Sequence, residues 1–254
     1  MKPPLQCKQM EKVVKPYEQE GSKKQQVSKM FDNIAHNYDF LNHFLSLGID
    51  KIWRKKMIAE LVEVQPKLIL DVATGTGDVA INTLKQLKIN DLHIVGLDIS
   101  PEMLNMGKKK IVTEGFAGRI EMVVGDSENL SFDDNKFDAI TVAYGVRNFE
   151  NLERGLSEMQ RVLKPNGKLV VLEFSKPRGF PIRQIFNFYF KNILPSIGKL
   201  ASKDNRAYSY LYESVQVFPD GDDFLKVLEK TGFKNIKCTP LTLGISSIYI
   251  GYKK

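Results

Sequence analysis

The chain has 254 residues, of which 43% are hydrophobic and 26% charged, and its formal net charge is +7. This length suits one α/β domain with a large core and one insertion, and the composition is ordinary for a soluble globular protein. No run approaches the roughly 18 apolar residues of a membrane span, and residues 1–20 lack the apolar centre of a signal peptide, so a cytoplasmic protein is expected. The two cysteines and three histidines lack metal-ligand spacing, so no metal is expected.

The first 25 residues are rich in Lys, Gln and Glu, and we expect them to form a flexible arm. Residues 26–254 are then expected to form a single domain. From Val27 onward apolar residues recur at helical spacing, and a second such pattern around Trp53 ends before Pro66. The domain is therefore predicted to begin with amphipathic helices.

A short apolar run ends at Asp71, where a turn of small residues leads into another helical pattern. Gly75 and Gly77 let the backbone approach a ligand closely, and the free N–H groups at the helix start add hydrogen-bond donors. Gly75-x-Gly77-x-x-Ala80 fits the loose dinucleotide fingerprint. Asp71-x-Ala73-x-Gly75-x-Gly77 fits the turn of S-adenosylmethionine methyltransferases equally well, and a merely tight connection is the third interpretation.

Strand and helix patterns then alternate along the chain, which predicts a parallel sheet with ligands at the carboxyl ends of its strands. Further strands are expected over residues 93–97, 120–124, 139–143 and 169–174, helices over 79–88, 152–163 and 222–230 and after Ser100, and a turn over 164–167. Strands over 234–238 and 245–252 are joined too closely for a helical crossover and should pair antiparallel. We therefore predict a doubly wound, Rossmann-like sheet closed by a C-terminal antiparallel hairpin.

Acidic residues follow the second and third strands of this sheet. Asp98 lies about twenty residues beyond the glycine turn, where a carboxylate can accept hydrogen bonds from both ribose hydroxyls of either cofactor class. A simple helix cap is the alternative for this residue. Asp126 can accept a hydrogen bond from an adenine amino group, with the Ser127 backbone near the ring edge, and this pair begins to favour the methyltransferase class.

A basic helical insertion is expected at about residues 176–220. From Lys176 to Arg206 seven bases stand against one acid, an excess of +6. Apolar and aromatic residues recur every three or four positions from Ile182 to Ile197, with Pro195 interrupting the pattern. An ordinary packed helix, a cover for a lipid and a membrane-surface contact all explain this stripe. Nucleic-acid binding is disfavoured because the aromatic residues do not alternate with the bases.

With these residues assembled, the chain resembles the class I S-adenosylmethionine-dependent methyltransferases, and more narrowly the menaquinone and ubiquinone biosynthesis C-methyltransferase family. Four segments carry the resemblance: Tyr38-Asp39-Phe40-Leu41-Asn42 through Ser46 to Trp53, Gly145-Val146-Arg147-Asn148, Arg161-Val162-Leu163-Lys164-Pro165 through Glu173-Phe174-Ser175, and Tyr210-Leu211-Tyr212-Glu213-Ser214 through Pro219. The chain departs from the family pattern at Asp50, where the family often has His, at Asn166, and at Gln216, where it usually has Arg.

This resemblance implies methyl transfer from S-adenosylmethionine, without a metal, to a ring carbon of a polyprenylated quinol. Demethylmenaquinol is the leading acceptor. By matching position, the resemblance adds Thr76 and Ala143 to the cofactor contacts Asp98, Asp126 and Ser127. No nucleic-acid partner is expected, the prenyl tail predicts peripheral contact at the inner face of the membrane, and a homodimer stays open.

The reaction needs a ring hydroxyl to ionise, so that the ring carbon becomes nucleophilic. Arg147 follows the fourth strand, and we predict that its fixed charge stabilises the ionised hydroxyl. Asn148 and Tyr38 would orient that hydroxyl or a water that takes its proton. A surface ion pair is the alternative for Arg147. For Tyr38, with Asp39 and Asn42, helix-end capping and a ligand lid both stay open.

Other acceptors and other enzyme classes also stay open. A ubiquinol precursor, RNA or another small molecule could take the methyl group. A nicotinamide-dependent oxidoreductase shares the glycine turn and Asp98, but it explains neither Asp126 nor the terminal hairpin. The polar pair Arg147-Asn148 disfavours a pure binding module.

Overall fold

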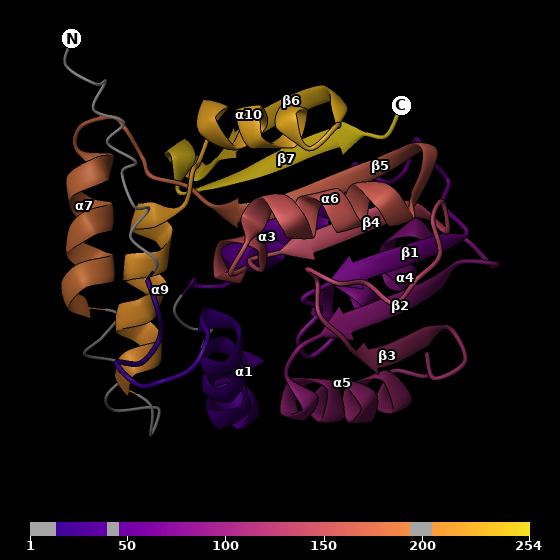
Figure 1. The fold of residues 1–254 in the computed structure, drawn as a ribbon, viewed down its shortest axis with the longest axis horizontal. Helices are drawn as coiled ribbons and strands as arrows, with labels where there is room; N and C mark the ends of the chain where they lie inside the picture. Colours follow the sequence, from indigo (N-terminus) through magenta and orange to yellow (C-terminus); the bar gives the residue numbers. More distant parts are fainter. Residues whose placement is uncertain (1–13, 40–45, 194–204) are drawn as a thin grey trace, which may run out of the picture.

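The computed structural model describes residues 14–39, 46–193 and 205–254. Within them, seven strands form one sheet in the order β3-β2-β1-β4-β5-β7-β6 (Figure 1). The strands are β1 (Leu68–Val72), β2 (His93–Asp98), β3 (Ile120–Val124), β4 (Phe137–Ala143), β5 (Leu163–Phe174), β6 (Lys234–Leu241) and β7 (Ser246–Tyr252). Strands β1 to β5 pair in parallel, and β7 pairs antiparallel with both β5 and β6. The predicted doubly wound sheet and its C-terminal hairpin are confirmed.

Helices cover both faces of this sheet and the carboxyl end of its parallel strands. They are α1 (Lys23–Ile34), α3 (Ile49–Ala59), α4 (Asp78–Leu87), α5 (Pro101–Thr113), α6 (Leu152–Val162), α7 (Ile182–Phe188), α9 (Asn205–Val217) and α10 (Asp222–Lys230), with short turns η1 (Ala35–Asn37), η2 (Val146–Asn148), η3 (Tyr189–Ile193) and η4 (Thr242–Gly244). Residues of α6 and α10 pack into one core cluster with the sheet, and residues of α3, α4 and α5 pack into another. In β1, Leu70 faces the first cluster and Ile69 the second. Burial on both faces explains why the central strands read as continuous apolar runs.

A third group of helices lies beyond the carboxyl ends of the parallel strands. Figure 1 shows α7 and α9 side by side there, with α1 next to them. Val27 and Met30 of α1 share a buried cluster with Phe186, Phe190 and Tyr210. This layer contains much of the predicted insertion, and it encloses the end of the sheet where ligands are expected.

The segment expected to be a flexible arm reaches α1 with defined contacts. Residues 1–13 lie outside the described residues. Further on, Arg206 Nε donates a hydrogen bond to the Pro16 carbonyl at 2.9 Å. The Ser22 side chain accepts from the Gln25 backbone, and the Gln25 side chain accepts from the Ser22 backbone. This capping box starts α1 at Lys23, inside the range assigned to the arm.

Two local predictions differ from the structure. The turn expected over residues 164–167 lies within β5, where the pairing with β4 jumps from Leu163 to Lys168. Asn166 bulges there with φ +62°, a left-handed conformation that asparagine tolerates. The helix expected from Ile182 ends at Phe188 and continues as the π-turn η3, while Pro195 lies outside the described residues.

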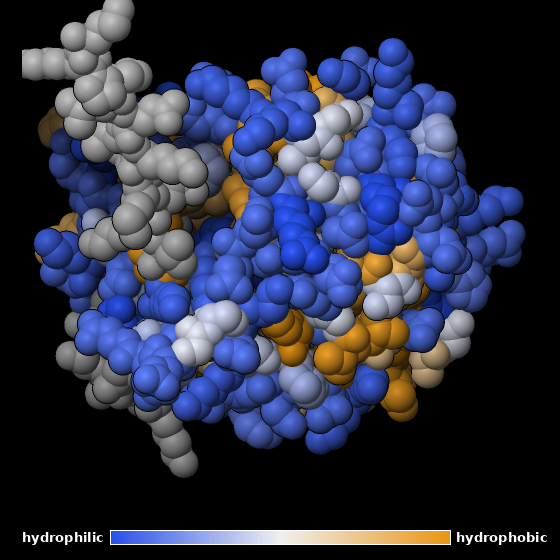
Figure 2. Space-filling model, in the orientation of Figure 1, coloured by the Kyte–Doolittle hydropathy of each residue, from blue (hydrophilic) through white to orange (hydrophobic). Residues whose placement is uncertain are grey.

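The described surface is largely hydrophilic on the face that carries α6 and α10, with hydrophobic patches in its lower half (Figure 2). In the part of the chain that the structure describes, no helix has the length and apolar character needed to cross a bilayer.

Candidate active site

The strand order reverses between β1 and β4, which is the place where open α/β sheets bind ligands. Ala73 follows β1 with φ +53°, and Tyr144 follows β4 with φ +59°. Such left-handed conformations are uncommon for residues with a Cβ and concentrate at functional sites. Gly145 lets the two turns meet, because a Cβ there would lie 2.6 Å from the Ala73 Cβ. Two strained turns therefore mark this end of the sheet.

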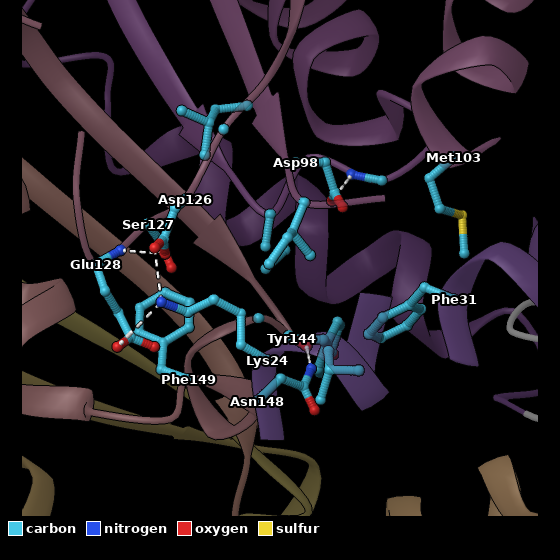
Figure 3. A pocket seen from close by; sticks show the side chains of 18 of the residues that line it. Lys24, Phe31, Asp98, Met103, Asp126, Ser127, Glu128, Tyr144, Asn148 and Phe149 are labelled. Atoms are coloured by element: carbon cyan, nitrogen blue, oxygen red, sulfur yellow. Dashed lines mark hydrogen bonds and ion pairs between the residues drawn. The ribbon is translucent and has the colours of Figure 1, made fainter. Parts of the chain in front are cut away.

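A cavity with about 660 Å³ of empty space opens beside these turns, and we call it the strand-end cavity. Its walls come from the ends of β1 to β4, from α1 and from the start of α5 (Figure 3). Seven predicted site residues line it: Tyr38, Gly75, Asp98, Asp126, Ser127, Ala143 and Asn148.

Asp98 ends β2 and is only 7% exposed. Its carboxylate accepts hydrogen bonds from the Gly75 backbone at 2.8 Å and from the Ser100 backbone at 2.9 Å. Burial raises the pKa of Asp98 to about 6, although these backbone donors oppose the shift. Because a carboxylate offers about four acceptor positions, Asp98 keeps capacity for ligand hydroxyls on the cavity side.

Asp126 lies across the cavity from Asp98 (Figure 3). Its carboxylate accepts from the Glu128 backbone at 2.9 Å and pairs with Lys24 of α1 at 2.6 Å. The same Lys24 ammonium lies 3.6 Å from the Glu128 carboxylate. Nothing in the sequence marks Lys24 as a site residue, because no motif distinguishes it from the other lysines of the predicted N-terminal arm. Phe149 adds an apolar wall, so the cavity combines carboxylates with a surface suited to a flat ring.

Three predicted cofactor residues lie outside the lining of this cavity. Asp71 is fully buried and accepts hydrogen bonds from the Thr74 and Thr141 hydroxyls, each at 2.6 Å, which tie the glycine turn to β4. Burial raises the pKa of Asp71 to about 6. Gly77, with φ +79°, is the N-cap of α4. The structure thus places these residues behind the turn, where they shape it.

Thr76 is the third of these residues, and it is also buried. Its hydroxyl donates to Asp39 at 2.6 Å, and the second Asp39 oxygen accepts from Lys110 at 2.8 Å. Asp39 therefore links the glycine turn to α5. Tyr38, the residue before Asp39, lines the cavity. Its ring lies 3.9 Å from the place that a Cβ would occupy if Gly75 had one. Asn42 lies outside the described residues.

A second cavity, with about 1,640 Å³ of empty space, lies between the strand ends and the layer of α7 and α9. Most of its lining is aromatic or aliphatic, and we call it the aromatic cavity. Phe31, Tyr38, Tyr144 and Asn148 line both cavities. These four side chains therefore lie at the boundary between the two cavities.

Arg147 lines the aromatic cavity, and its side chain is 9% exposed. Its guanidinium lies 2.9 Å from the Glu173 carboxylate, which is fully buried, and 5.6 Å from the centre of the Phe174 ring. It also donates to the Tyr144 carbonyl. Burial raises the pKa of Glu173, and Arg147 opposes that rise. The ion pair considered for Arg147 therefore exists, but it is buried at the cavity wall instead of lying on the surface.

Lys23 holds the η2 segment that carries Arg147 and Asn148. Its ammonium donates to the Arg147 carbonyl at 3.0 Å and to the Phe149 carbonyl at 2.8 Å. Burial lowers the pKa of Lys23 to about 8. This contact was not predicted, because a lysine in a polar segment gives no signal of burial. Helix α1 thus contacts the site in two places, at the η2 segment through Lys23 and at Asp126 through Lys24.

Comparisons with known proteins agree with this geometry. The sequence profile of the ubiE/COQ5 methyltransferase family matches residues 19–253. A demethylmenaquinone methyltransferase of Bacteroides fragilis is 50% identical over 240 residues, covering 94% of this chain and 97% of that protein. A ubiquinone/menaquinone biosynthesis C-methyltransferase UbiE of Geotalea daltonii is 46% identical over 231 residues, covering 91% and 97%. A solved SAM-dependent methyltransferase of Thermotoga maritima, 18% identical, shares the fold with a TM-score of 0.65 over 89% of this chain and 99% of that chain.

Proposed function

The chain belongs to the ubiE/COQ5 methyltransferase family, and on this premise we propose that it methylates a ring carbon of a polyprenylated quinol, with demethylmenaquinol as the acceptor. It is an S-adenosylmethionine-dependent methyltransferase, as the sequence predicted. The observation that carries the proposal is the meeting of two unlike cavities at Tyr38, Tyr144 and Asn148. One has carboxylates for a nucleoside, and the other has aromatic walls for an apolar ring and tail.

The residues of the strand-end cavity fit S-adenosylmethionine. Asp98 would accept hydrogen bonds from the ribose hydroxyls and Asp126 one from the adenine amino group, with Phe149 against the ring. Binding would require Lys24 to share the Asp126 carboxylate with that amino group. When bound, S-adenosylmethionine supplies the methyl group, whose bond to sulfur breaks as the bond to the ring carbon forms.

The aromatic cavity would hold the quinol ring at the junction and the start of its prenyl tail between α7 and α9. Arg147 would stabilise the ring oxygen after its proton leaves to water, and Asn148 and Tyr38 would orient that oxygen. After the methyl group is attached, the ring carbon loses its proton and the oxygen regains one, so the quinol gains CH₃ and releases one proton in total. Positioning of this kind can lower a barrier by about 7 to 11 kcal/mol.

The experiment that tests this function is a transfer assay with methyl-labelled S-adenosylmethionine. Reduced demethylmenaquinone should be methylated faster than a demethylated ubiquinol precursor. Oxidised demethylmenaquinone is the matched control, and it should give no product because it has no ring hydroxyl to ionise. Absence of transfer to reduced demethylmenaquinone, with cofactor still bound, would overturn the proposed substrate. Faster transfer to the benzoquinol would replace it.

We expect cofactor affinity to fall as the pH drops through about 6. The free protein holds Asp98 with a raised pKa of about 6, and only the ionised carboxylate accepts from two ribose hydroxyls. Below that pH the affinity should fall by about tenfold per unit, and above it the affinity should be constant. Titration of S-adenosylhomocysteine by calorimetry between pH 5 and 8 measures this. In Asp98→Asn the decline should be absent or smaller, and an equally steep decline there would assign it to another group.

We also propose peripheral membrane contact at the mouth of the aromatic cavity. Leu47 and Leu243, which are 83% and 74% exposed, and the exposed Ile185 all line this cavity. Arg178 and Arg183 are exposed in the same segment as Ile185. Apolar side chains flanked by bases match an anionic lipid surface. A prenyl tail could then enter the cavity directly from the bilayer.

The double variant Ile185→Ser/Leu243→Ser should bind anionic vesicles at least about tenfold more weakly than the natural chain, because two apolar side chains leave the lipid. Co-sedimentation at low salt measures this, and added salt should weaken binding of both proteins. Val62→Ser/Val112→Ser removes two exposed apolar side chains that do not line this cavity, and this control should bind normally. Equal weakening in this control, or no binding of the natural chain, would contradict the membrane proposal.

A further inference from the structure

Several buried polar atoms around the aromatic cavity have no hydrogen-bond partner among the described residues. They include Arg147 Nε, Asn148 Oδ1 and Tyr210 Oη. The Arg147 side chain is 9% exposed, Asn148 is 8% exposed and Tyr210 is 1% exposed. Buried polar atoms are nearly always paired in folded proteins, and an unpaired one is unfavourable. These three atoms lie around one cavity, and a ligand there could supply the missing partners once the side chains turn toward it.

One more unpaired atom in this lining, Arg54 Nε, has a different setting. The rest of its guanidinium already pairs with Asp78 and lies 3.7 Å from Asp50. Arg147 and Asn148 are neighbours in the η2 turn, and helix α9, which carries Tyr210, packs against that turn. Arg147 Nε, Asn148 Oδ1 and Tyr210 Oη are therefore the three atoms that could form hydrogen bonds with one ring oxygen of a ligand.

The chemistry of these three atoms suits an oxygen that changes its charge. Arg147 Nε and the Tyr210 hydroxyl are donors, and Asn148 Oδ1 is an acceptor. Burial raises the pKa of Tyr210, with Arg147 opposing the rise and Glu173 and Glu213 adding to it, so the hydroxyl stays protonated at neutral pH. A neutral ring hydroxyl would donate to Asn148. Once ionised, it would accept from both donors, so the wall favours the ionised form.

We propose that Tyr210 is a catalytic residue whose hydroxyl donates a hydrogen bond to the ring oxygen of the quinol. Together with Arg147, it would stabilise that oxygen in its ionised form. This inference rests on the proposed quinol substrate. Tyr210 keeps its own proton throughout, and the proton of the quinol hydroxyl passes to water. No group of the chain is oxidised or reduced.

The test is Tyr210→Phe, which removes one oxygen and keeps the ring that packs against α1 and α7. At neutral pH we expect kcat for reduced demethylmenaquinone to fall about 100-fold, as for loss of one donor to a developing oxyanion. The loss should shrink as the pH rises, because the missing donor raises the pKa of the bound hydroxyl and higher pH ionises it anyway. The melting temperature should stay equal or rise, since an unpaired buried hydroxyl is removed.

Tyr212→Phe is the matched control, because Tyr212 lies two residues further along the same helix and outside the cavity lining. It should leave kcat and its pH profile unchanged. A readout independent of turnover is the absorbance of bound 1-naphthol, which should ionise at lower pH in the natural protein than in Tyr210→Phe.

Three results would overturn the assignment of Tyr210. One is an unchanged kcat in Tyr210→Phe. Another is a loss that is equal at every pH and comes with a lower melting temperature, which would mean a structural role. The third is an unshifted ionisation of bound 1-naphthol. Failure of the natural enzyme to methylate the quinol would instead overturn the proposed function, and the inference with it.

Discussion

Replacing Arg147 by lysine is expected to lower kcat for the quinol by about 100-fold or more, with cofactor affinity unchanged. Lysine keeps a positive charge for the buried Glu173 carboxylate, but it lacks the planar fork and the Nε–H group that has no protein partner. Steady-state rates at saturating S-adenosylmethionine give kcat, and calorimetric titration with S-adenosylhomocysteine gives the affinity. Arg147 lines the aromatic cavity and not the strand-end cavity, so kcat should fall while the affinity for S-adenosylhomocysteine stays the same.

The choice of variant and control matters for this test. Arg147→Ala would leave the Glu173 charge buried without a partner, which typically costs about 3 to 5 kcal/mol of stability and would confuse the result. Arg161→Lys is the matched control, because Arg161 also pairs with carboxylates, at 2.9 Å from Glu158 and 2.7 Å from Asp134, but lines neither cavity. It should turn over normally. Full turnover in Arg147→Lys would remove Arg147 from the chemistry.

The second large effect is expected in Asp98→Asn, whose affinity for S-adenosylhomocysteine should fall by about 100-fold. The amide has one acceptor oxygen where the carboxylate has two, and its NH₂ group would face the backbone N–H of Gly75 or Ser100. Each hydrogen bond to a charged group is worth about 1.5 to 3 kcal/mol, so losing one or two accounts for that factor. Calorimetry above pH 7 measures it away from the titration of Asp98.

Asp138→Asn provides the comparison for Asp98→Asn. Asp138 also accepts two backbone hydrogen bonds, from Lys67 at 2.9 Å and Leu68 at 2.8 Å, but it lines neither cavity. Its replacement should reduce stability and leave the affinity intact. If Asp98→Asn bound the ligand as tightly as the natural chain, the ribose contact would be wrong.

Much of the fold was predictable because its signals are local. The strand from Ile120 to Val124 and the helix from Asp222 to Lys230 have the predicted bounds, since apolar periodicity and terminal residues mark them. Asp98 at the end of β2 and Arg147 after β4 could be placed at the ligand end of the sheet, because every strand of a parallel sheet ends at the same edge. The bulge at Asn166 could not be predicted, since a Lys-Pro-Asn-Gly segment reads as a turn whether or not pairing resumes beside it.

The sequence by itself determined the alternation of strands and helices, the glycine turn, the acids that follow β2 and β3, and the family. Local pattern and motif carry all of these. Only the tertiary structure decided that Asp71 supports the turn from behind, that Arg147 is buried against Glu173, and that Lys23 joins a turn 124 positions away. It also placed Tyr210, with its unpaired hydroxyl, in the same cavity wall. The physical reason is that the burial of a side chain and its hydrogen-bond partners depend on packing between distant segments. The residue type at one position does not indicate which distant segment packs against it.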